Sequence, residues 1–168
     1  TVSRQDPLKR VDLLIRGLAH TQTGVRAVIA GAGPLLEANK RLAVELGVAD
    51  RVEFVGFVDE ARLLALYAHA LAVFYAPYDE DYGYVTLEGF LSRKAVVTAR
   101  DSGGTLEFVR DGETGVVFDV EDVAGLARAL DGLMADKGQA ERMGEAGYRR
   151  AAGITWDAVV ESLAAHIP

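Results

Sequence analysis

Short apolar runs alternate with longer amphipathic stretches along nearly the whole chain. The runs are rich in valine and alanine, which favours buried strands, whereas the longer stretches repeat apolar residues every three or four positions, as helices do. The pattern predicts strands at residues 25–30, 51–55, 72–75, 95–98 and 115–118, with residues 1–3 as the end of an earlier strand. It predicts helices at residues 8–20, 35–46, 59–69, 83–92, 123–134, 139–152 and 155–166, and a short apolar piece at 106–109.

This alternation predicts the fold class. Strands separated by helices of this length form βαβ units with right-handed crossovers, and therefore a mostly parallel sheet with helices on both faces. We expect an α/β protein with a Rossmann-like three-layer α/β/α architecture, a sheet of about six strands, and a single domain over residues 1–168. Ligands bind such sheets beyond the carboxyl ends of the strands, so the loops after residues 3, 30, 75 and 98 form the expected binding edge.

Composition narrows the class of function. Half of the residues are hydrophobic and 26% are charged, as in ordinary globular proteins, and the absence of cysteine excludes disulfides and Cys-ligated zinc. Residues 1–51 carry a formal charge of +3 and residues 52–168 one of −10, which argues against nucleic acid as a partner. The longest apolar stretch, residues 63–77, is shorter than the roughly 20 residues that span a bilayer. We therefore expect a cytoplasmic protein with no membrane span and no secretion leader.

The segment P-Y-D-E-D-Y-G-Y-V-T-L-E-G-F, residues 77–90, places two glutamates around the start of a predicted helix. The amides of Gly83, Tyr84 and Val85 lie at the expected N-terminus of that helix, where unpaired N–H groups and a partial positive charge favour a phosphate. Glu80 and Glu88 offer carboxylates that accept hydrogen bonds from sugar hydroxyls. The combination favours a nucleotide-sugar as ligand.

The same helix has an expected apolar face and an expected buried acid. Tyr84, Leu87 and Leu91 recur at helical spacing, so we expect them to point to one face. Glu88 lies on the first turns near the binding edge, and a buried carboxylate there needs a partner, for which ribose hydroxyls are suitable. The alternative is that Glu80 is a loop acid and Glu88 a solvated helix residue.

Two cations flank the turn before the first helix. Arg4 and Lys9 precede the apolar spacing of that helix, at the expected binding edge. Cations at a helix N-terminus oppose the helix dipole, so this placement favours an anion between them. The alternative is a solvated charge run.

Two further patterns suggest other ligands. Gly31-Ala32-Gly33 follows a strand and precedes a helix, as in the G-x-G-x-x-G dinucleotide fingerprint, but Leu36 replaces the third glycine, and a tight turn is the alternative. The trio at residues 79–81 reads D-x-D, like the metal-binding motif of GT-A glycosyltransferases, but that interpretation leaves Arg4, Lys9 and Glu88 unexplained. We predict no metal site. The histidines lie on separate predicted helices and form no metal cluster: His20, His69 and His166.

Five short motifs, in order, resemble the C-terminal, donor-binding half of retaining GT-B glycosyltransferases of the group 1 or family 4 type. Residues 3–15 resemble G-R-x-x-x-x-K-G-x-D-x-L-I, with Ser3 and Arg10 in place of two glycines. Residues 31–34 resemble G-x-G-P, residues 52–58 resemble V-x-F-x-G-x-V, and residues 103–107 resemble G-G-x-x-E. Residues 80–88 match the E-x7-E signature of the family, with Asp81 in place of its usual glycine.

The resemblance implies a role for each matching residue. Arg4 and Lys9 hold the donor diphosphate, Glu80 binds the transferred sugar, and these three form the expected catalytic set. Glu88 binds the ribose, and the main chain at Val58 contacts the base. The remaining expected donor-binding positions are Gly31, Gly33, Gly83, Tyr84, Val85, Gly103 and Gly104.

The resemblance also implies a reaction. We expect metal-independent transfer, with retention of configuration, of a hexose-type sugar from a UDP-, GDP- or ADP-hexose to a glycan, lipid or small-molecule acceptor, without any cofactor. An N-terminal acceptor domain outside these residues is the expected partner, and any peripheral contact with a membrane is expected from it. The chain alone is expected to bind donor without efficient transfer. The alternative is a non-catalytic nucleotide or phosphosugar binding module with a flavodoxin-like fold.

Overall fold

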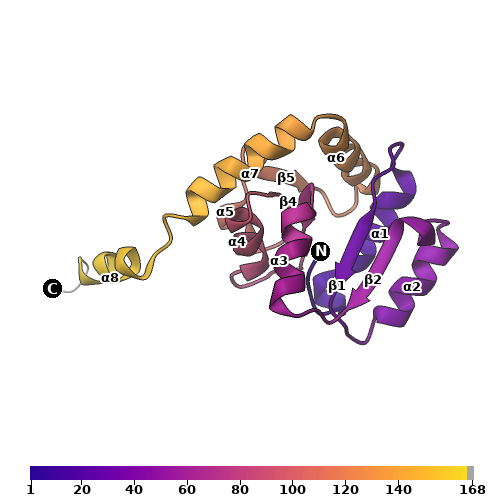
Figure 1. Ribbon diagram of the computed structural model, residues 1–168, viewed down its shortest axis with the longest axis horizontal. Coiled ribbons are helices and arrows are strands. Elements are labelled where there is room, and N and C mark those ends of the chain that lie inside the picture. Colours follow the sequence, from indigo (N-terminus) through magenta and orange to yellow (C-terminus); the bar gives the residue numbers. More distant parts are fainter. Residues whose placement is uncertain (166–168) are drawn as a thin grey trace.

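Parallel strands form the centre of the molecule, in two half-sheets (Figure 1). The computed structural model describes residues 1–165. Strand β1 (Ala27–Ala30) pairs with β2 (Val52–Gly56), and β4 (Ala95–Ala99) lies between β3 (Ala72–Phe74) and β5 (Gly115–Phe118). All of these pairs are parallel, and each strand predicted between residues 25 and 118 is present. The α/β class is therefore confirmed.

The predicted end of an earlier strand contributes a single bridge. Val2 lies parallel to Ala30, whose carbonyl accepts from the Ser3 amide at 3.1 Å. The contact continues past Gly31, whose φ of 111° favours glycine, to the Gln5 amide, which donates to the Ala32 carbonyl at 3.0 Å, but among the described residues no second bridge forms there. Among the described residues the two half-sheets therefore have five strands in all, to which Val2 adds an isolated bridge, where about six strands were expected.

The α-helices lie close to their predicted positions. Within the described residues, none of them is long and apolar enough to span a membrane. The predicted end of the last helix, residue 166, lies outside the described residues. The helices are α1 (Val11–His20), α2 (Leu36–Glu45), α3 (Glu60–His69), α4 (Tyr84–Leu91), α5 (Thr105–Phe108), α6 (Val123–Ala135), α7 (Lys137–Ala151) and α8 (Trp156–Ala164).

Helices cover both faces of the sheet, and a hydrophobic cluster lies on each face. Alternate residues of β4 belong to different clusters: Ala95 and Val97 pack in the cluster that holds α1 and α6, whereas Val96 packs in the cluster that holds Phe90 of α4. Because all of β4 is buried, its sequence is continuously apolar. The result is a three-layer arrangement from which α8 extends away (Figure 1).

The first predicted helix is broken at Arg10, which corrects the sequence prediction. Pro7–Lys9 form a 3-10 turn, Arg10 has a left-handed φ of 47°, and α1 begins only at Val11. Leu8, which was expected on the apolar face, is 58% exposed. The carboxylate of Asp6 explains the turn, because it accepts hydrogen bonds from the amides of Leu8 and Lys9 at 3.0 and 3.2 Å.

Helix α4 buries a different face from the predicted one. Gly89 and Phe90 are buried, whereas Tyr84 is 71% and Leu91 is 55% exposed. Close packing is the reason: a Cβ atom at Gly89 would lie 3.1 Å from Val73. Gly89, which has no side chain, therefore lies where α4 approaches Val73 of β3 most closely.

Candidate functional site

Three loops meet beyond the carboxyl ends of the strands: the loop before α1, the loop between β3 and α4, and the loop between β4 and α5. The Tyr78 amide donates to the Leu8 carbonyl at 2.8 Å, and the Gly104 amide donates to the Glu80 carbonyl at 2.6 Å. Glu80 also forms a parallel bridge with Gly103. The loops that were expected to form a binding edge are therefore in direct contact.

Lys9, Tyr75 and Glu80 form a charged cluster at this edge. The Lys9 ammonium donates to Glu80 Oε2 and to the Tyr75 hydroxyl oxygen, the latter at 3.3 Å, and the Tyr75 hydroxyl donates to the same Oε2 at 2.8 Å. The Lys9 and Glu80 side chains are each 23% exposed. Burial would raise the pKa of Glu80, but the hydrogen bonds from Lys9 and Tyr75 outweigh it and hold that pKa below its ordinary value. Glu80 is therefore an anion at neutral pH.

Glu88 is exposed, which corrects the expectation of a buried acid. Its Oε2 accepts a hydrogen bond at 2.6 Å from the hydroxyl of Tyr67, a side chain on α3 that is only 4% exposed. Burial first, and then this hydrogen bond, raise the pKa of Tyr67, so the phenol keeps its proton and donates. Burial raises the pKa of Tyr75 most, followed by the hydrogen bond and charge of Glu80 and then by the charges of Asp6 and Glu88. The charges of both glutamates therefore act on Tyr75.

The N-terminus of α4 is formed by backbone alone. Gly83 has a φ of 77°, and a Cβ atom there would lie 2.7 Å from the hydroxyl of Thr105, so only glycine fits without strain. Among the described residues, no side chain caps this end of the helix. The amides of Tyr84 and Val85 thus lie at an uncapped helix N-terminus, and in the sequence they stand between Glu80 and Glu88. Unpaired amides at a helix N-terminus suit an anion.

The glycine turn after β1 packs on the loop that carries Arg4. A Cβ atom at Gly31 would meet the Ser3 carbonyl, and one at Gly33 would meet the Gln5 carbonyl. The Gln5 side chain is fully buried and donates to the Gly31 carbonyl at 2.9 Å. This close backbone approach accounts for both glycines without a dinucleotide ligand.

Arg10, which the sequence marked only as a departure from glycine, joins the three loops. Its guanidinium donates to the carbonyls of Ala76 and Pro77 at 2.8 and 2.6 Å and pairs with both carboxylate oxygens of Asp101 at 2.8 and 2.7 Å. The hydrogen bonds from Arg10 are the largest cause that holds the pKa of Asp101 below its ordinary value. Its left-handed backbone explains why a glycine suits this place in the motif.

Two predicted site residues lie outside this network. The Arg4 side chain is 73% exposed, and its ion pair within the described residues is with Asp6 at 3.8 Å. Val58 is half-buried in the loop after β2, which is not one of the three loops that meet at the cluster. The structure therefore brings Lys9, Glu80, Gly103 and Gly104 together and packs Gly31 and Gly33 on the loop of Arg4, whose side chain points away from the Lys9–Glu80 pair into solvent.

The structure gives no support to a metal site at residues 79–81, the D-x-D trio of the sequence. Asp79 and Asp81 are both exposed, and Asp79 has a left-handed φ of 44°. In the part of the chain that is described, no group of three histidine, aspartate or glutamate side chains is arranged to hold a metal ion.

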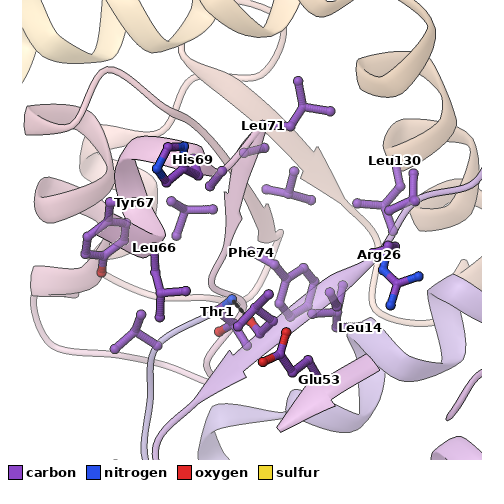
Figure 2. A pocket seen from close by; sticks show the side chains of 18 of the residues that line it. Thr1, Leu14, Arg26, Glu53, Leu66, Tyr67, His69, Leu71, Phe74 and Leu130 are labelled. Atoms are coloured by element: carbon purple, nitrogen blue, oxygen red, sulfur yellow. Dashed lines mark hydrogen bonds between the residues drawn. The ribbon is translucent and has the colours of Figure 1, made fainter. Parts of the chain in front are cut away.

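A cavity of about 510 Å³ opens between β1 and β3, away from the loops described above (Figure 2). Apolar side chains, among them Leu66, Leu71, Phe74 and Leu130, line most of it, and Tyr67 lies at its margin. None of the predicted site residues lines this cavity. The candidate site is therefore the open loop edge, and the cavity marks the gap between the two half-sheets.

Comparison with known proteins gives a consistent set of relatives. The family model described as Glycosyl transferases group 1 matches residues 1–150. The D-inositol 3-phosphate glycosyltransferase of Nocardia farcinica is 35% identical over 96% of this chain and 38% of its own length. The GDP-mannose-dependent alpha-(1-6)-phosphatidylinositol monomannoside mannosyltransferase of Mycolicibacterium smegmatis is 39% identical over 87% of this chain and 41% of its own length. The chain thus spans about two fifths of the length of these relatives.

Solved structures share the fold. HepE from Anabaena, in complex with UDP, superposes with a TM-score of 0.87 over 98% of this chain and 47% of its own, at 24% identity. The catalytic domain of the cholesterol-alpha-glucosyltransferase from Helicobacter pylori superposes with a TM-score of 0.83 over 92% of this chain and 96% of that domain, at 25% identity. These likenesses confirm the expected Rossmann-like α/β architecture.

Proposed function

Because the chain belongs to the glycosyl transferases group 1 family, we propose that it is the donor-binding half of a retaining, metal-independent GT-B glycosyltransferase. In this proposal, the whole protein transfers a hexose-type sugar from a nucleoside-diphosphate sugar to a glycan, lipid or small-molecule acceptor. The acceptor is bound by a second domain, since the chain spans only about two fifths of its relatives' length. The observation that carries the proposal is the Lys9–Tyr75–Glu80 cluster beside an uncapped helix N-terminus.

The mechanism follows from where charge develops. Breaking the bond between the anomeric carbon and the diphosphate builds negative charge on the diphosphate and positive charge on the sugar. Lys9, Arg4 and the amides at the start of α4 stabilise the first charge, and the carboxylate of Glu80 stabilises the second. The leaving phosphate takes the proton of the acceptor hydroxyl on the same face of the sugar, which retains the configuration. The cationic side chains take the role of a divalent cation.

Glu80 and Lys9 exchange partners when donor binds. Without donor they neutralise each other across their direct ion pair. A donor phosphate replaces the carboxylate as the partner of Lys9, and Glu80 then accepts hydrogen bonds from the sugar hydroxyls. Glu88 accepts from the ribose, and the main chain near Val58 contacts the base.

Titration calorimetry with GDP-mannose, UDP-glucose and ADP-glucose tests donor binding; the first is the donor named for one relative. We expect at least one of them to bind, and Lys9→Ala to weaken it by tenfold or more, since a hydrogen bond to a charged group contributes about 1.5–3 kcal/mol. Lys40→Ala, an exposed lysine of α2 paired with Glu37, is the matched control and should bind as the wild type does. If none of the three donors binds, or if both variants bind equally, the proposal is wrong.

Transfer is tested separately on the chain and on the full-length protein. The chain alone is expected to bind donor and to transfer little or no sugar, because the acceptor and a further catalytic contribution belong to the other domain. Sugar transfer by the isolated chain at the rate of the full-length protein would contradict this. Donor binding by a full-length protein that transfers no sugar would favour the non-catalytic binding module.

A further inference from the structure

Tyr67 has a polar group at an otherwise apolar position. The ring is 4% exposed and packs in the hydrophobic cluster that contains Val73, Phe90 and Val96, and it lies at the margin of the cavity in Figure 2. Phenylalanine would fill the same space. An unpaired hydroxyl in such surroundings costs free energy, and the hydrogen bond to Glu88 removes that cost.

The hydrogen bond joins a fixed group to a mobile one. Glu88 is exposed on α4, and an exposed glutamate ordinarily samples several rotamers. The bond of 2.6 Å from the anchored Tyr67 hydroxyl to Glu88 Oε2 selects one orientation. Among the described residues no donor contacts the other oxygen, Oε1, which stays available to a ligand.

The second glutamate has the same kind of support. Tyr75, also 4% exposed, donates to Oε2 of Glu80 at 2.8 Å. Each acid of the E-x7-E pair is therefore held through one oxygen by a buried phenol. Glu80 has Lys9 as an additional partner, whereas the orientation of Glu88 depends on Tyr67, so Tyr67 is the residue whose role can be isolated.

We propose that Tyr67 is a positioning residue of the donor site, which holds Glu88 in the orientation that accepts hydrogen bonds from the ribose. This inference rests on the proposed function, in which Glu88 binds the ribose. The opposite view is that Glu88 serves only to satisfy a buried hydroxyl and takes no part in binding. The two views differ in their dependence on the ribose hydroxyls of the ligand.

The test compares wild type and Tyr67→Phe with GDP, UDP and ADP and with the 2′-deoxy and 3′-deoxy form of each. For the nucleotide that wild type binds most tightly, Tyr67→Phe should bind about tenfold more weakly, as expected when one hydrogen bond to a charged group is misplaced. The loss should disappear with the deoxy form that lacks the hydroxyl bound by Glu88, because the oriented carboxylate then has nothing to accept from. A purely structural role would weaken ribo and deoxy forms alike.

Two further variants complete the experiment. Glu88→Ala should weaken ribonucleotide binding at least as much as Tyr67→Phe, and the double variant should be no weaker than Glu88→Ala alone, because Tyr67 acts through Glu88. Tyr148→Phe, a tyrosine of α7 that stacks with Arg93, is the matched control and should leave affinity unchanged. Unchanged affinity in Tyr67→Phe, or equal losses for ribo and deoxy forms, would overturn the inference while leaving the proposed function intact. Absence of binding by wild type would overturn both.

Discussion

Replacing Arg10 separates two opposing effects at one position. Arg10→Gly restores the residue of the sequence motif and relieves a left-handed backbone, whose φ is 47°. It also removes the guanidinium, which is 13% exposed and binds the carbonyls of Ala76 and Pro77 and the carboxylate of Asp101. Arg10→Ala removes the same contacts but keeps the strained backbone. The difference between the two variants therefore measures the strain less the greater backbone freedom that glycine has in the unfolded chain.

The contacts outweigh the strain. Each hydrogen bond from the guanidinium to a main-chain carbonyl contributes about 1.5–3 kcal/mol, and the partly exposed ion pair with Asp101 about 0.5–1 kcal/mol. Relief of the left-handed conformation returns about 1 kcal/mol. Arg10→Gly should therefore lower the free energy of unfolding by about 2.5–6 kcal/mol, and Arg10→Ala by about 1 kcal/mol more.

Urea unfolding of the three proteins at neutral pH measures these differences. Arg128→Ala, which removes an exposed arginine paired with Asp122, is the matched control and should change the free energy of unfolding by less than about 1 kcal/mol. Donor affinity should also fall in both Arg10 variants, because the three loops of the site are no longer tied together. An Arg10→Gly variant as stable as wild type would refute the reasoning, since the strain would then equal everything that the side chain contributes.

Two other predictions concern the start of α4 and the charge of Glu80. Gly83→Ala places a Cβ atom 2.7 Å from the Thr105 hydroxyl at a φ of 77°, so it should lower the free energy of unfolding by about 1–3 kcal/mol. Gly132→Ala, in open space on α6, is the control and should raise the free energy of unfolding slightly. A thermal unfolding experiment in which Gly83→Ala is the more stable of the two variants would contradict the packing. The lowered pKa of Glu80 means that its stabilisation is complete above its ordinary pKa of about 4.5 and is lost as the pH falls below that value. The difference in unfolding free energy between wild type and Glu80→Gln should thus shrink below about pH 4.5, and a constant difference would disprove the pairing.

The secondary structure was largely predictable because it depends on local periodicity. The continuous apolar run at 95–98 predicted a strand buried on both faces, and β4 is buried along its whole length. Failures occurred where contacts outside the helix decided the outcome. The Asp6 carboxylate accepts hydrogen bonds from two amides, which forms a separate 3-10 turn before α1 begins. In α4, Gly89 lies against the strands, whereas Tyr84 and Leu91 are exposed.

The candidate site was predictable only in part, for a related reason. Lys9, Glu80 and Gly103 were expected to meet because the carboxyl ends of parallel strands share one edge, and they do. Tyr67, Tyr75 and Arg10 were missed. The partners of these side chains become neighbours only through folding; Arg10 and Asp101, for example, are 91 residues apart in the chain. No motif marks a phenol on α3 as the partner of an acid on α4.

The sequence by itself determined the order of strands and helices, the binding edge and the family, because periodicity and short motifs are local properties of the chain. Only the tertiary structure decided which oxygen each glutamate leaves available, which loops Arg10 ties together, and that Arg4 extends into solvent. Those features depend on hydrogen bonds of about 3 Å between segments that are far apart in the sequence. Only the packing of the helices on the sheet brings these segments together, so no single segment reveals its partner.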